Sequence, residues 1–483
     1  MVITNQQKNQ HLLWRAGFGP MAEEYHQLAS ISQKSYISAL FKASSKSPVY
    51  IDVASNAIKG LVMGVQDIAR AQQQLDQQQR KQIRQQSRED LKSLNLTWLN
   101  EMVNTDMQLR EKMSLFWHGH FASRNINILY QQQLLDVIRQ NALGNFGGLL
   151  RGVSKSAAMI NFLNNNQNKK GHPNENFARE VMELFTMGRG NYTENDIKEA
   201  ARAFTGWGAA INGDFVFRRF QHDDGQKTVL GKTGRFDGDD VLDILLEHKQ
   251  TASYICRKIY RFFVNEQVDE QKVEWLAARF YQSSYDIKAL MNDIFTSDWF
   301  YDAKNIGSRI KSPVELIVGI RRSLPMTIEN AEVQLLLQRL LGQVLFYPPN
   351  VAGWPGGKNW IDSSSLMLRM RIPQLVYATD ELNMHPKDDD DQMMGMKDKP
   401  AMKGIGKKGG QVITASVDWK TYINQFEKVP RGELITGISK VLLQVKEGVD
   451  ESILNKYSDA SGRESFIKTV TIQIMSTPEY QLC

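Results

Sequence analysis

The sequence predicts a mainly α-helical fold, a multi-helix globular domain with one small β-hairpin or sheet insertion. Apolar residues recur at helical spacing through most of the chain, as at Leu109, Met113, Phe116 and Trp117, and this period gives each helix one apolar face. Between residues 211 and 235 the pattern changes to short β-favouring runs separated by Asp and Gly, which is typical of a hairpin.

The composition excludes several classes of protein. Of 483 residues, 42% are hydrophobic, so a large core is available and the chain is not disordered as a whole. The net charge is only +6 with interleaved acids and bases, so no nucleic-acid partner is expected. No stretch approaches the roughly 18 apolar residues of a membrane helix, so no membrane insertion is expected. Cys256 and Cys483 are too few for a Cys-based zinc site.

The chain is expected to divide into three parts. Residues 1–385 form the main helical domain, in which residues 65–90 are rich in Gln with few apolar positions and predict a projecting, solvated helix. In residues 386–411 an acidic run precedes Met, Lys and Gly without periodicity, which indicates a flexible insertion. Residues 412–483 return to amphipathic patterns and are expected to pack on the main domain as helices.

A His-Gly-His sequence follows the first of these apolar stripes. Gly119 is placed to end that helix. In an extended segment, the side chains of His118 and His120 would then point to the same side, as ligands of a divalent metal must. The alternative is a pair of structural imidazoles that form hydrogen bonds with nearby carbonyls.

A second polar cluster lies on a predicted helix that begins near Asn174. Helical spacing places Glu175, Arg179 and Glu183 on one face, with apolar residues on the opposite face. One interpretation is a solvated face of ion pairs. The other is catalytic: Arg179 holds one carboxylate ionised while a second carboxyl serves as general acid or base.

The next helix is expected to begin at Thr193, which forms a capping box with Asp196. Within it, Arg202 lies among small and apolar neighbours, so its guanidinium is expected to pair with a carboxylate such as Glu183. An irregular segment follows, in which His222 and Asp223 are candidates for a metal ligand or an acid.

Residues 346–360 form a loop rich in aromatic residues, Pro and Gly. Trp354 and Trp360 could present stacking faces to sugar rings or prolines, which would suit a saccharide or peptide substrate. They could equally close an opening in the core.

Taken together and in order, these motifs resemble the bacterial domain-of-unknown-function-1800 family, from about Leu12 to Arg371. The motifs are LLWRAGFGP, FWHGHF, PNENFAREVMELFTMGRGNYTENDI, ARAFTGW, HDDGQKTVLG and YPPNVAGWPGGKNWI. The resemblance implies a family without an established activity, in which many relatives resemble exported proteins and are encoded beside sulfatase-like proteins, a candidate partner. The characteristic polar positions that it implies are His118, His120, Asn174, Glu175, Arg179, Glu180, Glu183, Arg202, His222, Asp223 and Lys227.

The leading functional hypothesis is a hydrolase. Because no G-x-S-x-G motif is present, an activated water is expected as the nucleophile, with or without a divalent metal. The predicted catalytic residues are Glu175, Arg179, Glu183 and Arg202, and the predicted metal ligands are His118, His120, His222 and Asp223. The alternative is a noncatalytic binding or assembly protein in which these groups form a buried polar network. A cytoplasmic location is expected for the chain as it stands, and a periplasmic or exported one if a signal peptide has been removed.

Overall fold

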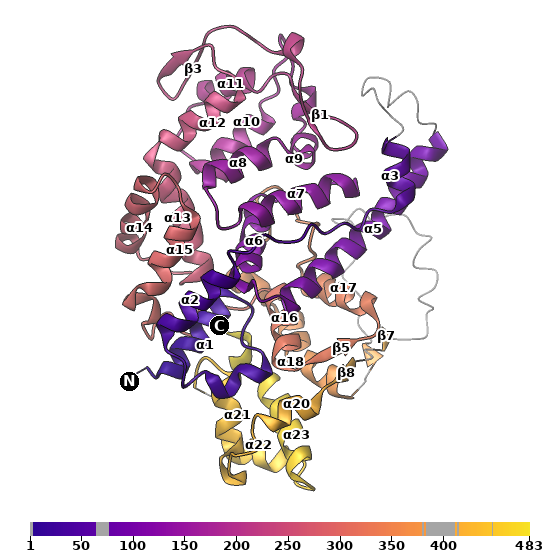
Figure 1. Ribbon diagram of the computed structural model, residues 1–483, viewed down its shortest axis with the longest axis vertical. Helices are drawn as coiled ribbons and strands as arrows, with labels where there is room; N and C mark the ends of the chain where they lie inside the picture. The colour runs from indigo at the N-terminus through magenta and orange to yellow at the C-terminus, as the bar shows by residue number, and fades with distance from the viewer. Residues whose placement is uncertain (1–2, 64–76, 379–380, 383–410, 413–414, 447) are drawn as a thin grey trace.

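Helices make up most of the chain in the computed structural model, and strands are few and short (Figure 1). The structure describes residues 3–63, 77–378, 381–382, 411–412, 415–446 and 448–483. The prediction of a mainly α-helical fold with small β insertions is confirmed.

The first half of the chain forms helices that surround α6 and α7 near the centre of the molecule (Figure 1). The helices are α1 (Asn5–Ala16), η1 (Ala22–Gln27), α2 (Gln33–Ala43), α3 (Asn56–Met63), α5 (Gln77–Asn104), α6 (Gln108–His120), α7 (Ile128–Asn141), α8 (Phe146–Ser154), α9 (Ala157–Phe162), η2 (Asn165–Gln167), α10 (Asn176–Glu180), the π-helix η3 (Val181–Thr186) and α11 (Glu194–Ala203).

The second half adds helices along one side and at the lower end in the view of Figure 1. They are η4 (Arg219–Gln221), α12 (Gly238–Glu247), α13 (Lys249–Phe263), α14 (Glu270–Gln282), α15 (Ile287–Thr296), η5 (Asp298–Tyr301), α16 (Pro313–Ser323), α17 (Ala331–Leu340), η6 (Gly357–Trp360), α18 (Ser363–Ala378), α20 (Trp419–Asn424), η7 (Arg431–Glu433), α21 (Leu434–Leu442), α22 (Glu451–Tyr457), α23 (Arg463–Met475) and η8 (Glu479–Gln481).

The described strands pair as four two-stranded antiparallel sheets. Near the expected insertion at 211–235 there are two hairpins rather than one, β1 (Trp207–Ala209) with β2 (Phe215–Phe217) and β3 (Lys227–Val229) with β4 (Lys232–Gly234). The second hairpin turns through Leu230 and Gly231, both at positive φ, as a type I′ turn requires. The other two sheets pair β5 (Met326–Ile328) with β8 (Ala415–Val417) and β6 (Glu381–Leu382) with β7 (Gln411–Val412).

The expected Gln-rich helix is present from Gln77 onward as the first part of α5, which extends away from the main body beside α3 (Figure 1). Most residues of this part are exposed or partly exposed, as expected for a solvated helix. Residues 65–76 of the predicted helix, and residues 386–410 of the predicted insertion, lie outside the described residues.

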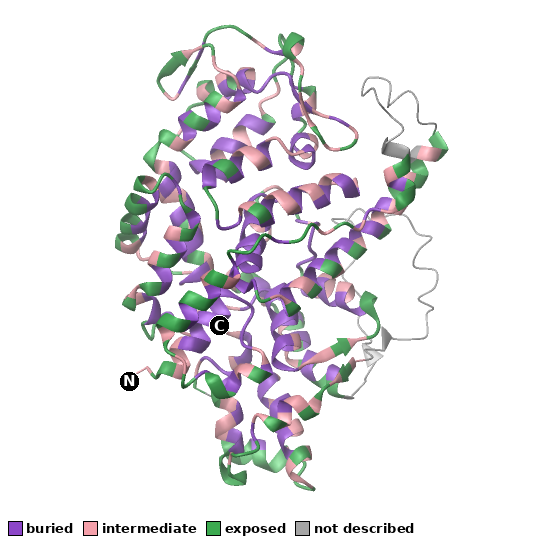
Figure 2. Cartoon of the chain, viewed as in Figure 1, coloured by how far each residue is buried: buried purple, intermediate pink, exposed green. Residues whose placement is uncertain are grey.

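A hydrophobic core connects the elements from the first helix to the last turn (Figure 2). Helix α5 packs against α16, α13 against α14, and α18 against α23, and α20 contacts η1 near the start of the chain. The C-terminal helices therefore contact elements of the first 385 residues, while the proposed division into three parts stays a prediction. In the part of the chain that the structure describes, no helix has the length and apolarity to cross a membrane.

Candidate functional site

The His-Gly-His segment is helical, contrary to the prediction. Helix α6 continues through Gly119 and ends at His120, so His118 and His120 point in different directions. Glycine is only a preference at a helix end, and here the backbone N–H of Phe121 still donates to the carbonyl oxygen of Trp117 (2.8 Å), so the helix continues past Gly119. Gly353, at φ +82°, approaches the carbonyl oxygen of Gly119 so closely that a Cβ at residue 353 would overlap it. The 346–360 loop thus packs on the last turn of the helix.

His118 is a core residue. It is buried and accepts a hydrogen bond at Nε2 from the backbone N–H of Phe346 (3.1 Å). Its ring contacts Trp98 and, at a centroid distance of 5.4 Å, Trp354. Burial lowers the pKa of His118 to about 3, so the imidazole is neutral and supports the 346–360 loop.

His120 contacts a different set of groups. Its Nε2 lies 3.1 Å from the carbonyl oxygen of Phe185, and its Nδ1 lies 3.0 Å from Nζ of Lys258. Because a carbonyl only accepts, Nε2 carries the proton and Nδ1 accepts from Lys258. Burial, with the charge of Lys258 second, holds the pKa of His120 well below its usual range, and burial lowers the pKa of Lys258 to about 8.

The predicted catalytic carboxylates lie on a charged surface of paired groups. Helix α10 passes into the π-helix η3 at Val181, so α-helical spacing no longer applies at Glu183. Arg179 pairs with Glu194 through both η nitrogens (2.9 and 2.7 Å) and with Glu175 at 3.3 Å. Glu183 instead accepts from the Tyr192 hydroxyl (2.7 Å) and pairs with Arg189.

The sequence suggested that Arg202 pairs with Glu183, and this prediction is wrong. Nε of Arg202 donates to Asp223 (2.8 Å) and its Nη1 to Glu199 (2.9 Å). The Arg202 guanidinium holds the pKa of Asp223 at about 2. His222 is buried beside this pair, with Nδ1 2.9 Å from the carbonyl oxygen of Thr205. The predicted capping box of Thr193 and Asp196 is confirmed at the start of α11.

The residues predicted as one site therefore have separate partners. His118 contacts the 346–360 loop, His120 contacts Lys258 and Phe185, and His222 contacts Thr205. Among the residues that the structure describes, no group of three or more His, Cys, Asp or Glu is arranged to hold a metal ion. Metal binding by His118, His120, His222 and Asp223 stays a prediction, and it would require these side chains to rearrange.

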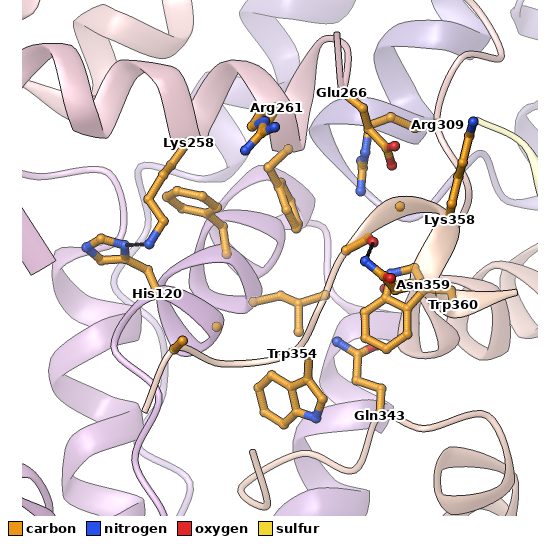
Figure 3. Close-up of a pocket in the computed structure, with 18 residues that line it drawn as sticks. His120, Lys258, Arg261, Glu266, Arg309, Gln343, Trp354, Lys358, Asn359 and Trp360 are labelled. Atoms are coloured by element: carbon orange, nitrogen blue, oxygen red, sulfur yellow. Dashed lines mark hydrogen bonds between the residues drawn. The ribbon is translucent and has the colours of Figure 1, made fainter. Parts of the chain in front are cut away.

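A different site is formed where α6, the end of α13 and the 346–360 loop meet (Figure 3). They enclose a cleft of about 570 Å³, hereafter the Trp354 cleft. It is lined by Leu115, Phe116, Gly119, His120, Lys258, Arg261, Phe262, Glu266, Arg309, Ser312, Gln343, Ala352, Trp354, Gly356, Gly357, Lys358, Asn359 and Trp360. Four cationic side chains, those of Lys258, Arg261, Arg309 and Lys358, thus share the cleft with a single carboxylate, Glu266.

Arg309 is the most deeply buried of these cations, with 6% of the residue exposed. Its Nη2 lies 3.4 Å from Glu315 Oε2, and its guanidinium stacks on the ring of Phe262 at 4.7 Å. Its Nη1 is also buried and has no hydrogen-bond partner. Leaving a buried charged donor without a hydrogen bond is costly. Because Nη1 has almost no surface open to solvent, an anion in the cleft would reach it only after the guanidinium turns toward the cleft.

Arg309 belongs to a buried ion cluster behind the cleft. Glu315 in α16 pairs with Lys112 of α6 (2.5 Å) as well as with Arg309. Burial would raise the pKa of Glu315, but the charges of Lys112 and Arg309 hold it well below its usual range. Lys311, nearby, donates to the carbonyl oxygen of Tyr480 (2.6 Å) and lies over the Trp14 ring.

Glu266 follows α13 and faces the loop at Gly357. Gly357 has φ +63°, and a Cβ there would overlap the Glu266 carboxylate, so only glycine fits both the backbone conformation and the space. Glu266 and Arg309 line the same cleft (Figure 3). Burial would lower the pKa of Arg309, but nearby negative charges, those of Glu315 and Glu266 among them, raise it. A carboxylate and a cation in one cleft can activate a water and orient an anionic group.

Sequence reasoning found the 346–360 loop but missed the side chains opposite it. Lys258, Glu266 and Arg309 come from segments whose local patterns are those of ordinary amphipathic helices and their ends. The only local signal is the Gly-Gly pair at 356–357, which indicates a close approach of the backbone to another group.

The comparisons with known proteins identify a family and no characterised relative. No curated protein and no solved structure shows a significant match to the chain. The model of one family matches residues 11–482, nearly the whole chain. This protein therefore belongs to the family described as "Protein of unknown function (DUF1800)".

Proposed function

We propose that the protein binds a small anionic substrate in the Trp354 cleft and hydrolyses it, with Glu266 as general base. The observation that supports this most directly is the unpaired Nη1 of the buried Arg309 in the cleft wall. An anion at this atom would form a charge-assisted hydrogen bond and complete the coordination of the guanidinium.

The charge balance of the cleft supports an anionic ligand. Lys258, Arg261, Arg309 and Lys358 face one carboxylate. Lys258 uses one proton on His120 and points a second toward the carbonyl oxygen of Leu184 (3.5 Å). An ammonium group has three donors, so one remains for a ligand.

Glu266 is the carboxylate placed to accept a proton from water. In the proposed reaction, the water oxygen forms a bond to the electrophilic atom of the substrate while Glu266 takes a proton from the water. The bond from that atom to the leaving group breaks, and the leaving group keeps the electron pair and takes up the proton from Glu266 or from solvent. Arg309 would stabilise the negative charge that develops on the substrate. Saccharides and peptides with an acidic group are the substrate classes that the Trp-rich loop suggests.

Calorimetric titration with inorganic phosphate and sulfate tests the binding step. Arg309→Met should weaken the binding of either anion by about tenfold or more. Arg189→Met is the matched control, because it removes the same charge from an exposed side chain outside the cleft. The proposal fails if neither anion binds, or if the two variants bind equally well while both remain folded.

Hydrolysis is tested separately with 4-nitrophenyl phosphate, 4-nitrophenyl sulfate and 4-nitrophenyl glucuronide, the last of which is a saccharide with an acidic group. Glu266→Gln should abolish turnover while anion affinity stays the same or rises, because the variant removes a negative charge from the cleft. Turnover that persists in Glu266→Gln would exclude the assigned base and leave the binding proposal intact.

A noncatalytic binding or assembly protein is the second candidate, and the buried cluster of Lys112, Arg309 and Glu315 favours it. Such ion networks can perturb titration without any catalytic role. An anion that binds at Arg309 without turnover of any substrate in the panel would support this second candidate. The predicted roles of Glu175, Arg179, Glu183 and Arg202 in catalysis stay predictions.

A further inference from the structure

We infer that the ligand of the Trp354 cleft carries its anionic group on a ring that stacks against Trp354. This inference rests on the proposed function, because it specifies which group is attached to the anion that Arg309 would bind. Two features of the same cleft indicate the substrate class: its cationic side chains and its aromatic side chains.

Trp354 is partly exposed and lines the cleft, and its ring contacts that of His118 at a centroid distance of 5.4 Å. His118 in turn is fixed by the hydrogen bond from the backbone of Phe346. The indole is thus supported by a fixed neighbour, and a rigid aromatic surface costs little entropy when a ligand binds to it.

Glycines leave room for a ring beside Trp354. A Cβ at Gly119 would meet no atom within 4 Å, and the same is true at Gly356. Gly119 is the penultimate residue of α6 and lines the cleft, so a side chain at this position would occupy part of the cleft.

The other side chains that line the cleft suit a flat, apolar ring of the ligand. Leu115, Phe116 and Phe262 line the cleft from α6 and α13, and Phe262 also stacks under Arg309. An anion at Arg309 thus lies next to aromatic surface, and the body that carries it would be enclosed between these residues and Trp354. A bare inorganic anion would leave this surface uncovered by ligand.

Calorimetry with matched ligands tests the inference. Phenyl phosphate, glucose 6-phosphate and inorganic phosphate form one series, and benzoate and acetate form a second. The ring-bearing anion of at least one series should bind about tenfold more tightly than its ring-free counterpart, as stacking on a Trp face would give. A preference for phenyl phosphate would identify an aromatic ring, and a preference for glucose 6-phosphate would identify a sugar ring.

Two variants separate stacking from anion binding. Trp354→Ala should abolish the preference for the ring-bearing anion but leave the affinity for inorganic phosphate unchanged, whereas Trp354→Phe should keep part of the preference. Gly119→Ala should weaken the ring-bearing ligand at least severalfold while the thermal unfolding midpoint stays the same or rises. This second variant keeps the test informative if Trp354→Ala fails to fold.

The outcomes distinguish this inference from the proposed function. If no anion of either series binds, the proposed function fails and the inference fails with it. If inorganic phosphate or acetate binds through Arg309 but a ring adds nothing in either series, the inference alone is wrong. A ring preference that survives both Trp354→Ala and Gly119→Ala would also overturn it.

Discussion

The charged surface of α10, η3 and α11 and the Trp354 cleft differ in how their charges are paired. On the charged surface, Arg179, Arg202 and Glu183 each have partners of opposite charge close in sequence or in the next helix. In the cleft, cations outnumber carboxylates, and Arg309 keeps a buried nitrogen without a partner. Clustered charges in a sequence therefore mark a paired surface as readily as a site, whereas a guanidinium in a cleft wall that is ion-paired through one nitrogen and without a hydrogen bond at another indicates unused binding capacity.

The largest expected difference between the two regions is in the free energy of unfolding when one carboxylate is removed, Glu315 behind the cleft or Glu183 on the charged surface. Glu315→Gln would leave Lys112 and Arg309 buried without their shared partner, and it should lower the free energy of unfolding by about 3–5 kcal/mol. Chemical denaturation measures this change. An effect below about 1 kcal/mol would mean that water or another anion compensates these cations.

A pH-dependent effect is expected at Lys311, behind the cleft. Burial lowers the pKa of Lys311 to about 7, whereas an unfolded lysine titrates near pH 10. Between these values the unfolded state binds more protons than the folded state, so stability should rise with pH through this window. Lys311→Met should remove up to about 1 kcal/mol per pH unit of that slope.

Denaturation of the wild type and of Lys311→Met at pH 7, 8 and 9 measures this slope. This difference in slope should vanish well below pH 7, where both states bind the proton, although the cost of burying the charged form of Lys311 is then at its largest. Equal slopes in the two proteins would show that Lys311 stays charged in the folded state.

An intermediate effect is expected from Arg309→Lys. This substitution keeps the charge but replaces a planar fork by a single ammonium group, so phosphate affinity should fall by about tenfold. Lys358→Arg, at an exposed position of the cleft rim, should change the affinity by less. Calorimetry that ranks the two variants in the opposite order would place the anion at the rim instead of at Arg309.

The smallest effect is expected on the charged surface. In Glu183→Gln, the amide oxygen still accepts from the Tyr192 hydroxyl, and the partner Arg189 is 85% exposed. The free energy of unfolding should change by about 1 kcal/mol or less. A loss as large as that of Glu315→Gln would contradict the distinction between the two regions.

Much of the fold follows from the sequence, because helices are set by local apolar periodicity and by caps such as Thr193 with Asp196. The helical state of Gly119 was not predicted, because glycine is only a preference at helix ends, and the loop that packs on this turn at Gly353 comes from far away in the chain. The turn at Leu230 and Gly231 was missed for another reason, since leucine rarely adopts positive φ.

The candidate site was harder to predict than the fold. Trp354 was found because its loop is rich in Pro, Gly and aromatic residues. Arg309 and Glu266 have no such local signature. They are site candidates only because tertiary packing places them in the cleft and leaves one nitrogen of Arg309 without a hydrogen-bond partner. A single sequence contains no direct record of such pairing.

The most direct test of the Trp354 cleft as an anion site is a crystal structure of the protein soaked with selenate, located by its anomalous signal. The account predicts a selenate within hydrogen-bond distance of Nη1 of Arg309, and no such peak in crystals of Arg309→Met. Selenate bound only at the charged surface of α10 and α11, or an Nη1 that donates to a protein group, would contradict it.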